Sequence, residues 1–311
     1  MRAGIVTQGG GEYLLPQLLR WEIDLTGGVP CDSFSVSCRY DGAPAAVLPE
    51  ANRFYAEENG ARVFYGVVDE FLLSETGQGR LLTLNGRGMA ALLTDNESEA
   101  MSYESADLRE IFRNHAAGYG FSCERMDALR GTKYRVESGS SQWKALSRFT
   151  EYYGGFSPRV TPLGKLILSA ETEGKTLRVE EDAPILSLSR GESRYGVFSE
   201  VLVKDKARGT ELLVENPELK ARGGSCRRVI YMPRRSSYAA MRYTGEYQIR
   251  KSQEDRKEIE LQLPGAFLAE PDDLIELRRE SLGIDGVFRV KEAESRGGAG
   301  GVLCTLRLGE R

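Results

Sequence analysis

A period-two alternation of apolar and polar side chains near the end of the chain constrains the fold more than any other feature. In the last segment, one side of the alternation consists of Val302, Cys304, Leu306 and Leu308. The segment 287–292 alternates less strongly, and Gly283 and Asp285-Gly286 before it are turn residues. Because alternate side chains of a strand lie on opposite faces, we expect segments 282–293 and 302–308 to form a β-hairpin that closes a barrel.

The same alternation occurs near the start of the chain. Two segments carry it on the apolar positions Trp21, Ile23 and Leu25, then Phe34, Val36, Cys38 and Tyr40. Further strands are expected at 52–56, 62–73 and 80–84, with a tight turn at Asn59-Gly60. The chain therefore predicts a small barrel or five-stranded meander over 16–86, with a loop at 41–51 and no clear assignment for 1–15.

The middle of the chain has helical rather than strand-like spacing. We expect one short helix over 88–94 and a second that begins after Ser105 and runs through Gly118. Ser140 or Ser141 would cap a third helix over 142–153, which Gly154-Gly155 ends. A hairpin over 156–160 and 165–170 follows, so this region reads as an α+β insertion.

Strands return from residue 175, and a helix is expected over 236–251. The predicted strands are 175–179, 185–190, 200–206, 211–215, 228–232, 258–263, 274–278, 287–293 and 302–308. We therefore predict a mainly β, α+β fold in which two small antiparallel β-barrels flank an inserted α+β domain. The predicted domains are 1–86, 87–174 and 175–311, and similar turn spacing in the outer two suggests a duplicated barrel.

Composition excludes several classes of protein. The 42 basic and 46 acidic residues give a net charge of −4, which argues against general nucleic-acid binding. The basic pairs Arg227-Arg228 and Arg234-Arg235 are interpreted as solvated turns around a strand. No run approaches the roughly 20 apolar residues of a membrane span, and no secretory signal is visible. Five scattered cysteines without a C-x-x-C pair are expected to be free.

The single histidine limits the available chemistry. A Ser–His–Asp triad or an imidazole-based zinc site would have to rely on His115 alone. Helical spacing places His115 on the same face as Leu108, Ile111, Phe112 and Tyr119. We therefore expect a packed, hydrogen-bonded histidine rather than a catalytic one.

Other possible sites are weak. Gly86-Arg87-Gly88 follows a strand and precedes a helix, but it lacks the third glycine of a dinucleotide loop. The carboxylates at 57–58, 180–182 and 272–273 all lie beside turns, where solvated charges are expected, and 180–182 has no EF-hand spacing for calcium. The tyrosines could form a stacking surface, but packing is the favoured interpretation; they are Tyr152, Tyr153, Tyr231, Tyr238, Tyr243 and Tyr247. We therefore predict no catalytic, cofactor-binding or metal-binding residues, and no enzyme activity.

The order of these elements resembles one known family. The segments that carry the resemblance are 64–69, 82–88, 141–146, 152–156, 163–166, 282–290 and 306–308. They resemble baseplate hub proteins of contractile-tailed phages and related contractile injection systems, the late control D or tail hub family. The resemblance covers most of 18–308 in order, whereas 1–15 and 207–255 match nothing in it.

The resemblance implies a structural function. Proteins of this family form homotrimers whose six barrels make a pseudo-sixfold ring, which joins the sixfold tail tube to the threefold central spike. The implied partners are the spike, the tail tube or tube-initiator protein, and the end of the tape-measure protein, without a cofactor. The implied location is the baseplate of a virion tail or injection particle assembled in the bacterial cytoplasm. An acidic balance would suit a lumen through which DNA or an effector passes.

Two alternatives remain open from the sequence. The chain could be a peptidoglycan- or carbohydrate-active enzyme associated with a tail, which would need a pair of carboxylates across a cleft. It could also be another tail assembly module built from β-barrels, such as a spike or tube protein.

Overall fold

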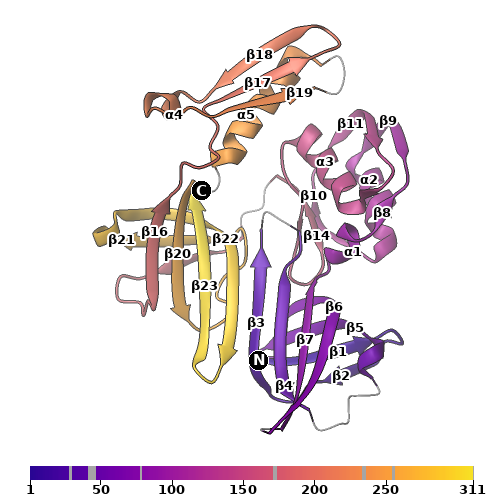
Figure 1. Ribbon diagram of the computed structural model, residues 1–311, viewed down its shortest axis with the longest axis vertical. Coiled ribbons are helices and arrows are strands. Elements are labelled where there is room, and N and C mark those ends of the chain that lie inside the picture. Colours follow the sequence, from indigo (N-terminus) through magenta and orange to yellow (C-terminus); the bar gives the residue numbers. More distant parts are fainter. Residues whose placement is uncertain are drawn as a thin grey trace.

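The computed structural model describes residues 1–27, 30–40, 47–77, 79–170, 174–232, 236–253 and 256–310. It is an α+β fold made mostly of strands, which confirms the predicted class. Within these residues thirteen strands form one continuous sheet, and four smaller sheets accompany it. In Figure 1 the N-terminal strands, in indigo and purple, lie beside the C-terminal strands, in yellow.

The first half of the large sheet comes from the N-terminal strands. Its elements are β1 (Arg2–Thr7), β2 (Glu12–Leu14), β3 (Leu18–Thr26), β4 (Ser33–Arg39), the turn η2 (Leu48–Glu50), β5 (Ala51–Glu58), β6 (Ala61–Thr76) and β7 (Gly79–Gly88). The predicted strands are present, and β1 and β2 now occupy the unassigned segment 1–15. The expected loop with Pro44 lies largely outside the described residues, which resume at Val47.

The second half comes from the C-terminal part of the chain. Its elements are β15 (Thr176–Val179), β16 (Ser187–Glu192), β20 (Lys257–Pro264), β21 (Leu274–Arg279), the turn η4 (Glu280–Leu282), β22 (Ile284–Gly298) and β23 (Gly301–Glu310). Every strand predicted for this half is present. Alternation buries one side of these strands, including Ile259, Leu261 and Leu306.

The two halves meet where β22 pairs with β3, at a junction we call the seam. Residues Glu292–Gly297 of β22 pair antiparallel with Trp21–Thr26 of β3. Before a β-bulge between Val290 and Glu292, β22 pairs instead with β21. The terminal hairpin therefore does not simply close a barrel, because its first strand bends at the bulge and joins the two halves into one sheet.

The two halves repeat one strand order. The first half has the order β3-β4-β7-β6-β5 and the second has β16-β20-β23-β22-β21, with every neighbour antiparallel. The corresponding strands also follow one another in the same chain order. This topology supports the duplication that turn spacing suggested.

The number of closed barrels expected from the sequence is not confirmed. Along the described chain, backbone pairing leaves both halves open, and their buried residues form one shared hydrophobic cluster that includes Phe54, Phe64, Leu84, Leu261 and Leu306. Two additional clusters belong to residues 89–168, between the halves, and to residues 201–249, inserted within the second half. The domain limits 1–86, 87–174 and 175–311 stay a prediction.

The α+β unit that follows β7 has its own core. Its elements are α1 (Ala91–Thr94), β8 (Glu97–Ser98), β9 (Met101–Asp107), α2 (Leu108–His115), η3 (Ala117–Tyr119), β10 (Cys123–Met126), β11 (Arg130–Val136), β12 (Ser140–Ser141), α3 (Gln142–Gly154), β13 (Arg159–Val160) and β14 (Leu166–Leu168). The predicted cap of the third helix is confirmed, since the Ser141 hydroxyl accepts a hydrogen bond from Lys144 N and Gly155 ends the helix.

The cap predicted for the second helix is wrong. Ser105 lies within β9, where it pairs with Thr132 of β11. The cap lies two residues later, at Asp107, whose carboxylate accepts the capping hydrogen bond from Glu110 N at 2.9 Å, and the helix begins at Leu108. At Ser105, backbone pairing with β11 is therefore favoured over the preference of serine for a helix N-cap.

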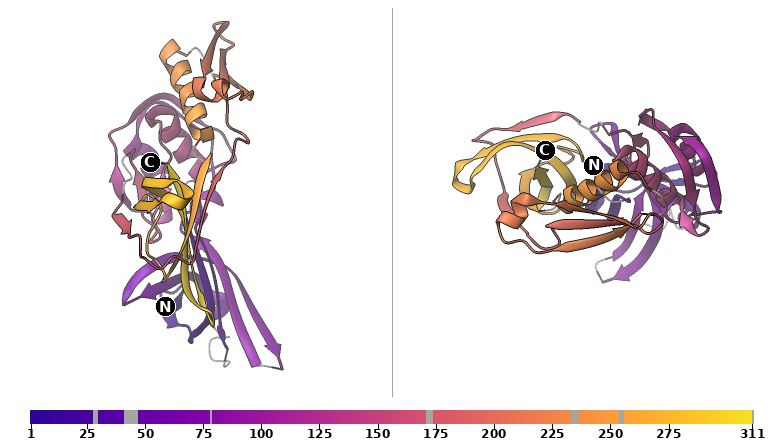
Figure 2. Two further views of the ribbon diagram at one scale, coloured as in Figure 1. Left: turned by 90° about the vertical axis from the view of Figure 1, so that its left-hand side faces the viewer. Right: turned by 90° about the horizontal axis from the view of Figure 1, so that it is seen from above.

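A third unit lies between β16 and β20, in the region that the family resemblance left unmatched. It consists of β17 (Glu200–Asp205), β18 (Thr210–Glu215), α4 (Pro217–Ala221), β19 (Arg227–Tyr231) and α5 (Tyr238–Gln253). The predicted helix over 236–251 is present despite Gly245. A Cβ there would lie 2.5 Å from the Val214 side chain, so glycine allows the helix to approach the sheet closely. Figure 2 shows this unit at one end of the long axis.

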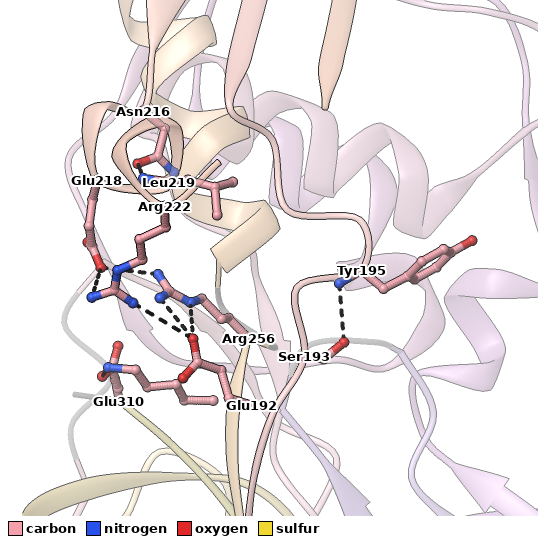
Figure 3. Close-up of polar contacts among 10 residues, drawn as sticks. Glu192, Ser193, Tyr195, Asn216, Glu218, Leu219, Arg222, Arg256 and Glu310 are labelled. Atoms are coloured by element: carbon pink, nitrogen blue, oxygen red, sulfur yellow. Dashed lines mark hydrogen bonds and ion pairs between the residues drawn. The ribbon is translucent and has the colours of Figure 1, made fainter. Parts of the chain in front are cut away.

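A buried arginine joins the third unit to the large sheet (Figure 3). The Arg256 guanidinium donates to Glu192, at the end of β16, at 2.9 and 3.0 Å, and to Glu218 of α4 at 3.3 Å. Nearby, the Tyr195 side chain on the connecting segment is 97% exposed. Arg256 therefore joins Glu192, at the start of the segment that leads into the third unit, to Glu218 in helix α4 of that unit.

Candidate functional surface

The outward face of the large sheet carries a concentration of carboxylates at the seam. We call it the seam face, and it consists of Glu22, Asp24, Glu260, Glu292, Glu294, Arg296 and Arg307. These side chains point outward because β3, β20, β22 and β23 alternate, and their neighbours Ile23, Ala293 and Leu306 are buried in the core. The seam face lines a hollow of about 350 Å³.

Like charges face each other across the seam. Glu294 and Asp24 are directly opposite in the β22–β3 register. Burial raises the pKa of Asp24, and the neighbouring carboxylates of Glu22 and Glu292 raise it further, against a hydrogen bond from the Ser33 hydroxyl at 3.1 Å. Burial likewise raises the pKa of Glu294, against the attraction of Arg296 and with added repulsion from Asp24 and Glu22. The ionised carboxylates at the seam therefore oppose folding.

Three arginines only partly balance this charge, and the first, Arg20, lies 3.6 Å from Glu22. Arg307 lies 2.7 Å from Glu292 and 3.5 Å from Glu258, and Arg296 lies 3.5 Å from Glu294. The five carboxylates of the seam face outnumber these three guanidinium groups, so it remains acidic. Carboxylate oxygens of Glu22, Asp24 and Glu294 lie within 4.8 Å of one another, but an acidic cluster alone is common on surfaces and we assign no metal to it.

The seam face was not among the sites that the sequence suggested. The alternation in 20–25 and 287–292 places Glu22 and Asp24 on one side of their strand, and Glu292 on one side of its own. That these strands are neighbours follows only from the pairing of residues about 270 positions apart, Glu294 with Asp24. The sequence therefore shows which face of each strand carries the carboxylates. It does not show the strand pairing that brings them together.

His115 is packed, as predicted. Its side chain is 1% exposed; Nδ1 lies 2.8 Å from Gln142 Oε1, and Nε2 lies 3.1 Å from the Tyr103 hydroxyl. Burial lowers the pKa of His115, against the hydrogen bond with Gln142. The imidazole therefore favours its neutral form, between Gln142 at the start of α3 and Tyr103 of β9.

Gly86-Arg87-Gly88 is part of a strand rather than a phosphate loop. A Cβ on Gly86 would lie 2.0 Å from the Val67 carbonyl oxygen, so the glycine is required by close strand packing. Arg87 donates to both carboxylate oxygens of Asp69, at 2.7 and 2.9 Å, and also pairs with Asp95. The rejection of a dinucleotide site agrees with this geometry.

The expectation that these carboxylates are solvated turn charges holds for Glu180 and Glu181 but fails for Asp272-Asp273. Glu180 and Glu181 are exposed beside arginines, as expected for solvated turn charges. Asp273, in contrast, is 6% exposed and accepts hydrogen bonds from the backbone N–H groups of Lys175 and Glu270 at 2.9 and 2.8 Å. The solvated interpretation is wrong for this pair, because the turn folds back on Asp273 and buries it.

Asp272 connects the α+β unit to the large sheet. Its carboxylate lies 3.3 Å from Arg159 of β13 and 3.4 Å from Arg289 of β22. Arg159 also donates to the backbone carbonyl of Pro271. Glu57 and Glu58 have simpler ion pairs, with Arg62 and with the N-terminal amine.

The tyrosines do not form one surface. Tyr153 packs against Tyr134 and Phe149 in the core of the α+β unit, as the packing interpretation predicts. Tyr238 and Tyr243, on α5 of the third unit, are exposed, so packing within the chain does not explain them.

The remaining residues that the sequence singled out are accounted for. Arg227 pairs with Glu200, and Arg228 lies over the Phe198 ring, whereas Arg234-Arg235 fall outside the described residues. All five cysteines are free. Each helix of the described ranges is too short or too polar to cross a bilayer.

Comparison with solved structures places the fold among tail proteins. A tail protein from Neisseria meningitidis MC58 aligns with 99% of this chain and 96% of its own, with a TM-score of 0.80 and 19% identity. The 43 kDa tail protein of prophage MuSo2 from Shewanella oneidensis aligns with 99% of this chain and 97% of its own, with a TM-score of 0.77 and 17% identity. At such identities the likeness establishes the fold.

A secretion-system protein shares the fold more distantly. The Escherichia coli c3393 protein is described as a component of the type VI secretion system, structurally similar to the bacteriophage T4 tail proteins gp27 and gp5. It aligns with 94% of this chain and 73% of its own, with a TM-score of 0.58 and 8% identity. No protein-family model and no curated protein sequence matches the chain.

Proposed function

We propose that this chain is a structural baseplate hub of a phage-like contractile tail or injection machine. Three copies would form a ring with six similar lobes, which joins the sixfold tail tube to the threefold central spike. The repeated strand order of the two halves carries this proposal. A chain with two equivalent lobes presents pseudo-sixfold symmetry when three copies close around one axis.

The similar structures support this proposal. The two tail proteins match the chain over nearly its full length, so both halves and both additional units have counterparts in them. We propose the central spike and the tail tube or tube-initiator protein as partners, with the tape-measure end in the cup above the ring. The site of action would be the baseplate of a virion tail or injection particle, assembled in the bacterial cytoplasm.

We further propose that the seam face lines the channel of the ring. It carries five carboxylates on the outward side of the strands that join the two lobes. A polyanion such as DNA would be weakly repelled by such a lining and would pass without binding. A role as a channel lining would explain why these carboxylates lie close together although their repulsion lowers the stability of the fold.

The structure favours this role over catalysis. Asp273 accepts backbone hydrogen bonds and Asp272 pairs with two arginines, while Glu180 and Glu181 pair with arginines of the same region. These carboxylates act in folding and in joining units. We therefore propose a structural protein without enzymatic activity.

The test is the mass of the assembled protein. The chain would be purified alone and after co-expression with its cognate spike protein, and its mass measured by light scattering. We expect three copies per particle in the presence of the spike. A chain that remains monomeric in the presence of its spike protein would contradict the proposal.

A further inference from the structure

We propose that the free edge of β6 pairs, antiparallel, with the free edge of β16 in a neighbouring copy of this chain. The contact would continue the large sheet from one copy to the next. This inference rests on the ring proposed above, and it names the strands and the register through which the ring closes.

Among the described residues of one chain, both edges are open. Strand β5 covers β6 only over Ala61–Val67, so the remainder, Glu70–Thr76, pairs on one side alone, with β7. Strand β16 ends the path of the large sheet and pairs only with β20. Edges of this kind present unpaired backbone N–H and C=O groups that favour pairing with another chain.

The seam shows how such edges fit together. In the repeated strand order, β6 corresponds to β22 and β16 corresponds to β3. Within the chain, β22 of one half pairs with β3 of the other. The same junction between copies would therefore join β6 to β16, and the alternating strand directions along the path make both junctions antiparallel.

The correspondence extends to single residues. Strand β6 has a bulge between Val68 and Glu70, and β22 has one between Val290 and Glu292. From each bulge to the hairpin end there are seven cross-strand pairs, which finish at Thr76–Gly79 and at Gly298–Gly301. The free segment of β6 is thus the equivalent of the segment of β22 that forms the seam.

This correspondence predicts the register between copies. The pair Glu294–Asp24 of the seam becomes Leu72 opposite the neighbour's Gly191. By the same mapping, Ser295–Ile23 becomes Leu73 opposite Arg190. Arg296–Glu22 becomes Ser74 opposite Ser189.

Burial supports a missing strand beside β6. The core-side residues of the seam segment, Ala293 and Ser295, are each 2% exposed. Their equivalents in β6 are Phe71 and Leu73, which are larger and apolar, yet 41% and 40% exposed. A strand laid along this edge would cover both side chains, and that burial would stabilise the contact.

The first test is a disulfide across the predicted register. Ser74→Cys and Ser189→Cys would be combined in a chain whose partly exposed thiols, Cys31, Cys123 and Cys226, are replaced by alanine. Within one copy, six strands of the large sheet lie between β16 and β6, so we expect the disulfide to form between copies, where it gives a product of higher mass under non-reducing conditions. The control, Ser74→Cys with Leu188→Cys, shifts one partner to the opposite face.

The second test introduces charge at the edge. Leu73→Lys would place an ammonium group against the neighbour's Arg190, whereas Leu73→Glu would place a carboxylate there. Leu73 is partly exposed in the single chain, so both variants should fold. We expect Leu73→Lys to weaken self-association at least about tenfold more than Leu73→Glu does, because like charges repel across strands.

The outcomes separate this inference from the proposed function. Covalent dimers and trimers from the first cysteine pair, absent from the control, would support the inference. A trimeric mass without any covalent product, and with equal effects of both Leu73 variants, would overturn the edge pairing while the hub proposal stands. A chain that stays monomeric with its spike would overturn both.

Discussion

Replacing Glu294 by glutamine should stabilise the protein near neutral pH. Glu294 lies directly opposite Asp24 across the seam, and like charges in that position are destabilising. Cross-strand charge pairs are worth roughly 0.2–1 kcal/mol, and the Glu294 side chain is 31% exposed, so solvent screens part of the repulsion. We therefore expect a gain of about 0.5 kcal/mol, which corresponds to a rise in Tm of about 1–2 °C for a large domain.

The stability gained by Glu294→Gln should depend on pH. The pKa values of Asp24 and Glu294 are raised in the folded protein, so their ionisation opposes folding and stability is lost as pH rises through that range. The gain from Glu294→Gln should therefore be present at about pH 7 and shrink at about pH 4, where carboxylates take up protons. High salt should also reduce it.

Thermal unfolding at both pH values is the assay, with Glu211→Gln as the matched control. Glu211 is also cross-strand, but it faces Lys204, at 2.7 Å, so its neutralisation should bring no gain. A Glu294→Gln protein that is no more stable than the parent at neutral pH would refute the reasoning. An equal gain at both pH values would refute the electrostatic cause.

Three further predictions follow from single residues. Gly86→Val should destabilise the sheet by about 1–3 kcal/mol or prevent folding, because its Cβ would overlap the Val67 carbonyl; denaturant unfolding measures this. The contribution of His115 to the free energy of unfolding should fall as pH drops from about 7 to 5.5, since burial disfavours its protonation while the unfolded chain gains a proton; the stability of the parent relative to His115→Gln should therefore fall over this range. Arg256→Ala should speed proteolysis near Tyr195, because it removes both hydrogen bonds from Arg256 to Glu192 and leaves only the longer ion pair with Arg222; an unchanged cleavage rate would count against that role.

Local sequence patterns predicted the elements well. Period-two alternation located the long strands of the two halves, whereas β9 and β11 of the α+β unit were not predicted; Ser141 and Gly155 marked the ends of α3 as predicted. These features depend on neighbours a few residues away, which the sequence displays directly. The cap at Ser105 failed because a distant partner, Thr132, recruits that residue into a strand.

The relation between the halves could not be predicted in the same way. The terminal hairpin showed its turn and its alternation, but the strand partner of Glu292–Gly297 is Trp21–Thr26, at the other end of the chain. The bulge at Val290 and Glu292, which frees the end of β22 for that partner, has no local signature that we recognised. The seam and its acidic face therefore follow from pairing rather than from composition.

The burial of charged side chains was the second feature that the sequence did not predict. Asp272-Asp273 look like ordinary turn residues, yet Arg159 and Arg289 converge on Asp272 from two different parts of the fold. A turn that contains two carboxylates is usually solvated; here the turn folds back on Asp273, and the docking of the α+β unit brings Arg159 to Asp272.

Electron microscopy of the purified particle in top view tests the central claim most directly. The account predicts a closed ring with threefold symmetry and six similar lobes, in which each copy contributes two adjacent lobes joined at β3 and β22. A particle with a single lobe pair, or a ring whose lobe number is not six, would contradict it.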